Sequence, residues 1–219
     1  MLCMKLSRER LNALTTAAYE RAAAELQRSC DGARCAALCR RLNGVIGDEV
    51  EALEAAGAGV ACAPGCDFCC HLRVDVFRHE AVALLHRLRT GMAPDVAAAI
   101  EERIVANAQR VDAMTPEQHR VAGLACAFLV GGRCSAHDVR PSACAAYHSM
   151  SRERCEQSFR EPLGIGTARN TRPALLELQV LGSALIEATQ AGCAAARRPS
   201  EQAELHQSLR ELLTSAEPL

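Results

Sequence analysis

Apolar residues recur at helical spacing over most of this 219-residue chain. A spacing of three or four residues places side chains on one face of an α-helix. The clearest stripe lies in residues 41–56 and consists of Leu42, Val45, Ile46, Val50 and Leu53. A weaker, alanine-rich stripe in residues 8–29 consists of Leu11, Leu14, Ala18 and Leu26. Both segments are predicted to be helices, and Gly57 and Gly59 end the helix at residues 41–56.

Start and stop signals extend this pattern along the chain. Proline and glycine mark helix boundaries. They predict further helices at residues 78–89 before Gly91, at 94–112 from Pro94, from Thr115-Pro116-Glu117 onwards, at 173–190 between Thr171-Arg172-Pro173 and Gly192, and at 200–213. Residues 72–76 alternate between apolar and charged side chains, which predicts one short extended segment. Residues 123–160 are expected to be mostly loop with short helical turns. The expected fold is all-α, a single domain over residues 1–219 in which a helical scaffold carries two cysteine-rich loops and at most one short β segment.

Composition decides what the core is made of and which partners to expect. The chain has no Trp, four Phe and two Tyr, so Ala, Leu and Val must supply most of the buried apolar area. The net charge is −1, which predicts no nucleic-acid partner. The start shows no secretory signal, and no run approaches the ~20 apolar residues of a membrane span, so we expect a cytoplasmic protein without a membrane partner. In that reducing compartment, 13 cysteines favour metal binding or catalysis over a disulfide framework.

Eight of these cysteines fall in two polar loops. The first loop, residues 60–71, contains CAPGCDFCC and places four thiols within nine residues: Cys62, Cys66, Cys69 and Cys70. The second, residues 124–156, spaces its thiols more widely, at Cys126, Cys134, Cys144 and Cys155. Turn-forming Gly or Pro lies between the cysteines of both loops, and close spacing keeps the entropy cost of gathering ligands low. All eight are therefore candidate metal ligands.

The type of ligand limits which metals the site is expected to bind. Thiolates are soft ligands that select zinc or iron–sulfur chemistry over magnesium or calcium. Zinc or iron, the latter also as an iron–sulfur cluster, is therefore the expected cofactor, and the spacing is not that of a ferredoxin run. Adjacent Cys69 and Cys70 cannot easily point the same way, so either they serve two metals or one is a spectator thiol. A vicinal disulfide is strained and disfavoured in the cytosol. The competing interpretation, small buried hydrophobic residues, suits an isolated cysteine on a helix better than four thiols in nine residues.

The first loop also has the three-cysteine spacing of radical SAM enzymes. Cys62, Cys66 and Cys69 form C-x3-C-x2-C, and Phe68 stands before the third thiol. Those enzymes need a (β/α) barrel of apolar strands that alternate with helices, whereas this chain offers one short strand candidate. Because a motif outside its structural context is weak evidence, this interpretation is not preferred.

Together, the two sets resemble the YkgJ-type cysteine-cluster family of zinc- or iron-chelating proteins. The resemblance rests on Cys62-Ala-Pro-Gly-Cys66-Asp-Phe-Cys69-Cys70, Cys126-Ala-Phe-Leu, Gly132-Arg133-Cys134 and Arg140-Pro141-Ser-Ala-Cys144, with Cys155 as a further cysteine. It covers about residues 60–160, and it departs from the family at His137-Asp138, where an aromatic and an acidic residue are common. The resemblance implies a metal-chelating protein with a role in metal handling or redox sensing. A relative with similar cysteine clusters, the flagellin lysine-N-methylase, keeps open a metal-cluster-dependent, protein-modifying enzyme, although no cofactor or substrate site is visible outside the cysteines.

The remaining cysteines and histidines have more ordinary interpretations. Cys30, Cys35 and Cys39 are predicted to be buried thiols, because Cys35 and Cys39 share a helical face with apolar neighbours. Cys3 and Cys193 carry no functional prediction. Four histidines in helical segments are predicted to lie on the surface: His79, His86, His119 and His206.

Three residues beside the motif cysteines have open roles. His71 and His148 could complete a mixed Cys/His site, but a hydrogen-bonded histidine is commoner, so neither joins the predicted ligands. Cys70 beside His71 is the closest candidate for an activated nucleophile, although adjacency in sequence does not establish the geometry. Arg140 is expected to fix a loop by hydrogen bonding, with anion binding as the alternative.

Overall fold

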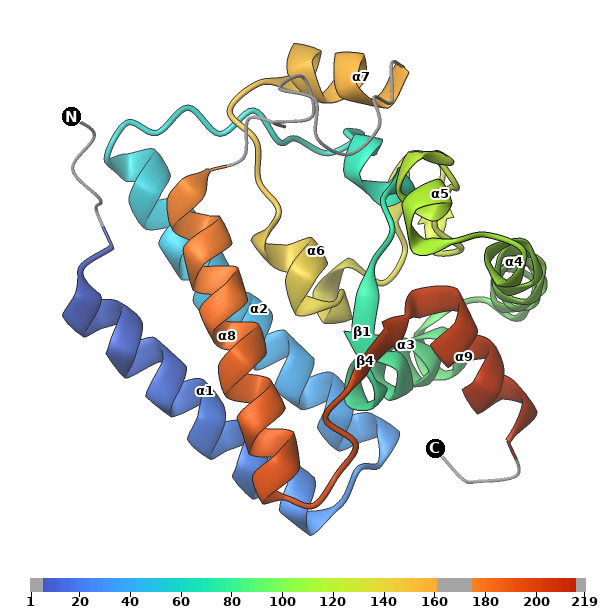
Figure 1. Ribbon diagram of the computed structural model, residues 1–219, viewed down its shortest axis with the longest axis horizontal. Coiled ribbons are helices and arrows are strands. Elements are labelled where there is room, and N and C mark those ends of the chain that lie inside the picture. Colours follow the sequence, from blue (N-terminus) through green and yellow to red (C-terminus); the bar gives the residue numbers. More distant parts are fainter. Residues whose placement is uncertain (1–5, 161–174, 216–219) are drawn as a thin grey trace.

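The protein is built mainly from helices, as Figure 1 shows. This computed structural model describes residues 6–160 and 175–215. The α-helices are α1 (Arg8–Arg28), α2 (Gly32–Ala55), α3 (Arg78–Gly91), α4 (Pro94–Asp112), α5 (Pro116–Val121), α6 (Ser142–Ala146), α7 (Arg152–Arg160), α8 (Leu176–Ala195) and α9 (Leu205–Thr214). Two 3-10 helices are η1 (Phe68–His71) and η2 (His137–Val139). The predicted all-α class is confirmed.

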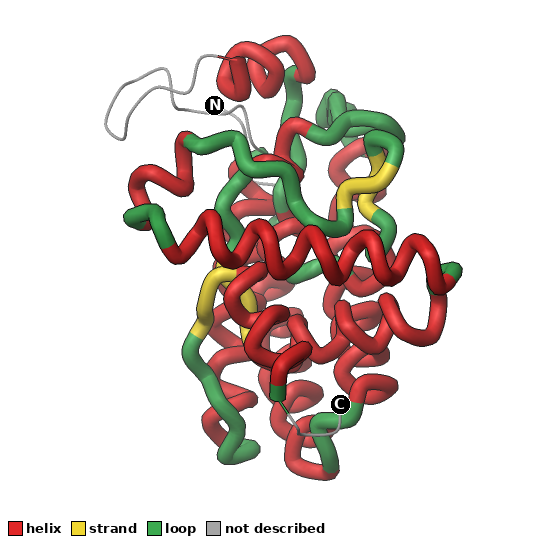
Figure 2. Tube along the Cα trace, turned by 90° about the vertical axis from the view of Figure 1, so that its right-hand side faces the viewer, coloured by secondary structure: helices red, strands yellow, loops and turns green. Residues whose placement is uncertain are grey.

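The limit of one short β segment is wrong. Strand β1 (Asp75–Phe77) pairs antiparallel with β4 (Gln202–Glu204), and β2 (Leu129–Val130) pairs with β3 (Arg133–Cys134). Figure 2 shows the two pairs as separate small elements. The β1–β4 pair joins segments more than a hundred residues apart, which no local pattern reports. Within residues 6–160 and 175–215 the strands form no barrel, so the radical SAM interpretation lacks the fold it requires.

Two helix starts differ from the prediction for local reasons. Helix α2 begins at Gly32 rather than near residue 41, because the carboxylate of Asp31 accepts a hydrogen bond from the Arg34 N–H at 2.9 Å and caps the helix. Helix α9 begins at Leu205 rather than 200, because residues 202–204 are taken up by β4. The predicted start of α8 at residues 171–173 lies outside the described residues.

Helices α1, α2 and α8 lie side by side and form the bundle seen in Figure 1. Gly192 was predicted to end α8, but the helix continues to Ala195. A Cβ atom at residue 192 would lie 2.6 Å from Ala22 Cβ and 2.9 Å from the Tyr19 carbonyl oxygen. Gly192 is therefore the point where α8 approaches the backbone of α1 closely, not a terminator.

The core is aliphatic, as the composition predicts, and Cys35 and Cys39 are buried in it. The second cysteine segment contributes buried residues to this core, including Ala127, Phe128 and Val139. By contrast, none of residues 57–75 is buried. The two cysteine segments are therefore held differently: the second is anchored by burial, and the first by other contacts. None of the described helices has the length and apolar character needed to cross a membrane.

Candidate metal site

The two cysteine segments meet through three hydrogen bonds. The Cys126 N–H donates to the Cys70 carbonyl at 2.8 Å, and the Ala61 N–H donates to the Ser149 carbonyl at 2.8 Å. The Ser149 N–H donates to Cys62 Sγ at 3.3 Å. Residues 61–70 are therefore bonded to both ends of the second segment, although about 55–90 positions separate the partners in the sequence.

Short turns shape the first loop. The Cys66 N–H donates to the Ala63 carbonyl at 3.0 Å, and Gly65 has a φ of 89°, which favours glycine. The Cys70 N–H donates to the Asp67 carbonyl at 2.8 Å and begins the turn of η1. These turns place four thiols in one compact loop without burying any of them in the core.

Helix α7 packs against this loop by aromatic contacts. The ring of Phe159 lies 5.9 Å from that of Phe68 and 4.6 Å from that of His71, measured between centroids. The guanidinium of Arg152 lies 5.8 Å from the centre of the Phe68 ring. The same helix carries Cys155, which is buried. The aromatic residue before the third thiol therefore positions α7, and with it a candidate ligand.

A tight hairpin brings Cys126 and Cys134 together. Gly131 and Gly132 have φ values of 56° and 74° at the turn between β2 and β3. Two successive positive φ values match a two-residue hairpin turn. Cys134 pairs with Leu129 across the hairpin, and the Leu129 N–H donates to the Cys126 carbonyl at 3.0 Å. The turn expected between these two cysteines is confirmed.

A buried carboxylate anchors the Arg140–Cys144 motif. Glu80 Oε1 accepts from the Ser142 N–H at 2.8 Å, and Glu80 Oε2 accepts from the Phe77 N–H at 3.0 Å. Glu80 is 2% exposed, so both bonds form away from water, where an unpaired group is costly. Glu80 therefore holds the starts of α3 and α6 together. Its position three residues into a helix was the available sequence signal.

A second polar anchor holds the residue after Cys126. Glu204 accepts from His206 Nδ1 at 2.9 Å, which leaves Nε2 of the neutral ring as an acceptor. Nε2 lies 3.2 Å from the Ala127 nitrogen and 3.2 Å from Asn107 Nδ2, and both groups donate to it. Helix α9 therefore positions the Cys126 loop. The surface prediction for His206 is wrong, as it is for His79 and His119, because all three side chains are buried.

The turn before Arg140 has an ionic anchor. Arg40 and Arg87 donate to the Asp138 carboxylate at 2.9 and 3.1 Å. Burial would raise the pKa of Asp138, but these two guanidinium groups outweigh it and hold the pKa below its usual value. Asn43 Nδ2 donates to the Arg140 carbonyl at 3.0 Å. Asp138 thus holds this turn against α2 and α3.

Electrostatic coupling links Cys62, Cys66 and Cys155 in what we call the first group. Burial raises the pKa of Cys62, and the charges of Cys66, Cys69 and Cys155 raise it further. Burial likewise raises the pKa of Cys66, together with the charges of Cys69 and Cys155. The charge of Cys155 therefore acts on both Cys62 and Cys66, so the three thiols lie near one another.

Cys70, Cys126, Cys134 and Cys144 form the second group. The pKa of Cys70 is raised by its hydrogen bond with the Cys69 side chain, by burial, and by the charges of Cys126 and Cys134. Burial raises the pKa of Cys126 to about 12 and that of Cys144 well above its usual value. Cys69 acts on Cys134 and Cys144 as well as on the first group, so it stands where the two groups meet.

The thiols of both groups stand apart in this structure. Across residues 6–160 and 175–215, no three Cys, His, Asp or Glu side chains converge closely enough to hold a metal ion. Thiolates that share one zinc lie within about 4 Å of each other, because each Zn–S bond is about 2.3 Å. The arrangement gathers the candidate ligands without closing a coordination shell.

Of the residues whose roles the sequence left open, His71 makes a hydrogen bond that suits a metal ligand. Its Nδ1 lies 3.1 Å from the Asp67 carbonyl and must donate to it, because a carbonyl oxygen only accepts. A metal-binding histidine commonly directs its second nitrogen to a carbonyl in this way. The same bond occupies Nδ1, and the pKa of Cys70 is raised rather than lowered. Cys70 and His71 therefore lack the features of an activated nucleophile.

Arg140 and His148 lie in the same region. Their Nε and Nδ1 atoms, respectively, are buried without a hydrogen-bond partner among the described residues. The charge of Arg140 lowers the pKa of Cys134 and Cys144 against the larger effect of burial. Arg140 therefore favours thiolates in the second group, in addition to its carbonyl contact with Asn43.

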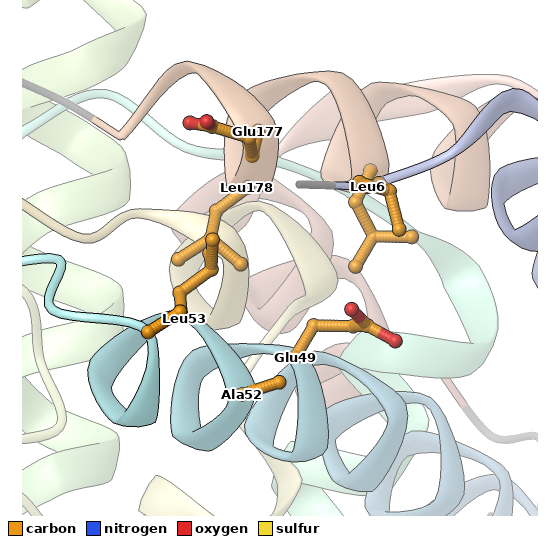
Figure 3. A pocket seen from close by; sticks show the side chains of 8 residues that line it. Leu6, Glu49, Ala52, Leu53, Glu177 and Leu178 are labelled. Carbon is orange, nitrogen blue, oxygen red and sulfur yellow. The ribbon is translucent and has the colours of Figure 1, made fainter. Parts of the chain in front are cut away.

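A separate apolar pocket lies between α2 and α8 and is shown in Figure 3. Its volume is about 370 Å³, and it is lined by Leu6, Glu49, Ala52, Leu53, Ala56, Glu177, Leu178 and Leu181. None of these residues is a cysteine or histidine, and Glu49 is paired with Arg10 at 2.9 Å. The pocket therefore offers no thiol or imidazole group, and its lining shares no residue with the thiol site.

One family model matches the part of the chain that contains both cysteine segments. Residues 61–162 match the family model CxxCxxCC, described as "Putative zinc- or iron-chelating domain". The matched range contains all eight candidate ligands. It also contains the three parts of the second segment that polar anchors hold: the residue after Cys126, the turn before Arg140 and the start of α6. The chain matches no curated protein and no solved structure. Residues 61–162 are therefore similar to the CxxCxxCC cysteine-cluster family, the family that the two motifs had indicated.

Proposed function

We propose that this protein binds zinc or iron in two adjoining four-thiolate centres. Cys62, Cys66, Cys69 and Cys155 form the first centre, and Cys70, Cys126, Cys134 and Cys144 form the second. The observation that carries the proposal is the meeting of two distant segments in which charged thiols of the second segment oppose ionisation in the first: Cys155 acts on Cys62, and Cys126 and Cys134 act on Cys70. A bound cation removes that opposition. One core cluster extends from Leu6 to Leu212 and includes residues of the second segment, so we propose that the chain is a single domain.

The donor set fits such a metal. Four thiolates satisfy the tetrahedral preference of zinc, and the same set holds iron or an iron–sulfur cluster. The adjacent pair Cys69 and Cys70 supplies one ligand to each centre, which accounts for two neighbouring thiols at the junction of the groups. Because a cysteine side chain turns about a single Cα–Cβ bond before its sulfur, the thiols can close on a metal by rotation and a small loop adjustment. In this role, the protein serves metal handling or redox sensing.

Metal content is expected to fall by half when one centre is broken. The variants are Cys66→Ser for the first centre and Cys144→Ser for the second, with Cys39→Ser, outside both loops, as a control that keeps a thiol-sized side chain. Elemental analysis of anaerobically purified protein should give equal metal content for the wild type and the control, half of it for each single variant, and none for the double variant; the wild-type value is two metals per chain where each centre holds a single ion. A visible spectrum separates a coloured iron–sulfur cluster from colourless zinc.

Three other results have clear meanings. Loss of all metal in either single variant would indicate one shared centre. Full metal content in the double variant would exclude these thiols as ligands. Wild-type protein purified without metal, and unable to bind zinc or iron on addition, would overturn the proposed function and leave the cysteines as structural or redox-active thiols.

Metal binding is expected to weaken as the pH falls. The pKa of Cys126 is about 12, and those of Cys134 and Cys144 are also raised, so these thiols hold their protons at neutral pH until a metal displaces them. Raising the pH favours the thiolates and therefore favours the metal. Each displaced proton changes the apparent Kd by about tenfold per pH unit. Competition with a chelator of known affinity at pH 6.5 and 7.5 should show at least about a hundredfold difference. An affinity independent of pH would contradict thiolate ligation.

A further inference from the structure

A second sulfur site lies outside the matched family domain, where α1 gives way to α2. Cys30 stands immediately before Asp31, the N-cap of α2, and Cys35 is the fourth residue of that helix. Side chains at these two positions commonly pack together across a helix start. Here they place Cys30 Sγ 3.2 Å from Cys35 Sγ. Figure 1 shows this turn at the opposite end of the bundle from α7.

The two sulfurs are already close to bonding distance. A disulfide bond is about 2.05 Å long, so the sulfurs need to approach by only about 1 Å. Cys30 is half-buried and reachable from solvent, whereas Cys35 is fully buried behind it. Cys30 is therefore placed to react with an oxidant from solvent, and Cys35 is placed to form the disulfide with Cys30 afterwards.

The surroundings favour a thiolate at Cys30. A hydrogen bond from the Cys35 thiol lowers the pKa of Cys30 to about 7, and the charges of Arg198 and Arg78 act in the same direction. Burial and the Asp31 carboxylate oppose them. Cys35 keeps its proton, because the same hydrogen bond and its burial raise its pKa. The N-terminus of α2, directly after Cys30, also favours negative charge.

The nearby thiols of Cys39 and Cys193 have neither the solvent access nor the lowered pKa of Cys30. Cys39 is fully buried, and burial raises its pKa well above the usual value. Burial raises the pKa of Cys193 to about 12, and its Sγ lies 3.7 Å from Nδ1 of buried His79. The charge of Glu80 acts on both Cys39 and Cys193 in the unfavourable direction. Among these four thiols, Cys30 and Cys35 are therefore the pair whose geometry suits disulfide formation.

We propose that Cys30 and Cys35 form a redox-active dithiol that small hydroperoxides oxidise to a disulfide. The Cys30 thiolate attacks the peroxide, the O–O bond breaks, and an alcohol or water leaves with one proton, so that Cys30 becomes a sulfenic acid. Cys35 Sγ then attacks Cys30 Sγ, and the hydroxyl group leaves as water with the proton of Cys35. Two electrons pass from the two thiols to the peroxide. A thiol reductant restores the pair.

The sequence provides a direct readout of this reaction. Trypsin cleaves after Arg28, Arg34 and Arg40, so Cys30 and Cys35 end in separate peptides, 29–34 and 35–40. Full-length protein treated with one equivalent of hydrogen peroxide, alkylated and digested without reductant should give these two peptides joined, and dithiothreitol should separate them. Because Cys39 lies in the second peptide, the joined product is also measured in Cys39→Ala, where it should remain.

The variants separate the two steps. Cys35→Ser should stop at the sulfenic acid, which dimedone labels at Cys30, whereas Cys30→Ser should show neither dimedone label nor joined peptide at this site. Cys193→Ala, the matched control, should behave as the wild type. Iodoacetamide should alkylate Cys30 about tenfold faster at pH 8 than at pH 6, as expected for a pKa near 7.

Two results would overturn the proposal. One is separate, reduced peptides 29–34 and 35–40 after peroxide treatment, with oxidation confined to residues 62–70 or 126–155. The other is a joined product that disappears in Cys39→Ala. Because each peptide is measured separately and the site lies outside the metal loops, neither result bears on metal binding.

Discussion

Removing the metal with a chelator is expected to raise amide exchange about a hundredfold in residues 61–71 and 147–155, while α1, α2 and α8 keep their protection. The first loop has no buried residue and is joined to the second segment by a few hydrogen bonds near its thiols. Without a bound cation, no metal–sulfur bonds hold these thiols together. Metal binding contributes to folding wherever the unfolded chain cannot form the site, and a hundredfold change corresponds to about 2.7 kcal/mol.

The anchored part of the second segment supplies the internal control. The Ala127 N–H is held by His206, and the Ser142 N–H by Glu80, both in buried surroundings. These amides should stay protected after chelation, unlike those of Ala61 and Ser149. Hydrogen exchange with mass spectrometry, before and after chelator, measures both sets. The metal-free variant lacking Cys66 and Cys144 should exchange rapidly in the same regions without chelator. Equal protection of residues 61–71 in all samples would show that metal does not order this loop.

Replacing Gly192 by valine is expected to destabilise the protein by about 3 kcal/mol. A Cβ atom at this position would lie 2.6 Å from Ala22 Cβ, 2.9 Å from the Tyr19 carbonyl oxygen and 3.0 Å from the Ala23 nitrogen. Two of these neighbours are backbone atoms of α1, so a side-chain rotation cannot relieve the overlap. The helices must separate, and overpacking of this kind typically costs about 1–3 kcal/mol, with valine at the upper end.

The matched control is a glycine in a helix with open space around it. Gly44 lies in α2, is exposed, and would place a Cβ with no other atom within 4 Å. Gly44→Ala should therefore stabilise the protein by about 1 kcal/mol through helix propensity. Urea unfolding monitored by circular dichroism compares both variants with the wild type. A Gly192→Val protein as stable as the wild type would show that α1 and α8 are not in close contact in solution.

The sequence alone was sufficient for most helices and for the identification of the two cysteine-rich segments. Helix α4 occupies residues 94–112 as predicted, because an initial proline and a regular apolar stripe are local signals. The two motif-ordered cysteine sets identified the family without any structure. The hairpin turn at Gly131-Gly132 could also be expected, because two successive glycines are a local turn signal.

Tertiary structure decided what local patterns do not encode. His206, Glu204 and Glu80 look like ordinary polar helix residues, and only the packing of α9 and α3 makes them buried anchors for the cysteine segments. Gly192 carried the same sequence signal as a helix terminator, and only the approach of α1 gives it another role. The meeting of the two cysteine segments depends on hydrogen bonds between positions about 55–90 residues apart. The sequence thus identified the candidate ligands, whereas long-range packing decided which cysteine segments meet, because burial and contact between distant segments leave no periodic trace along the chain.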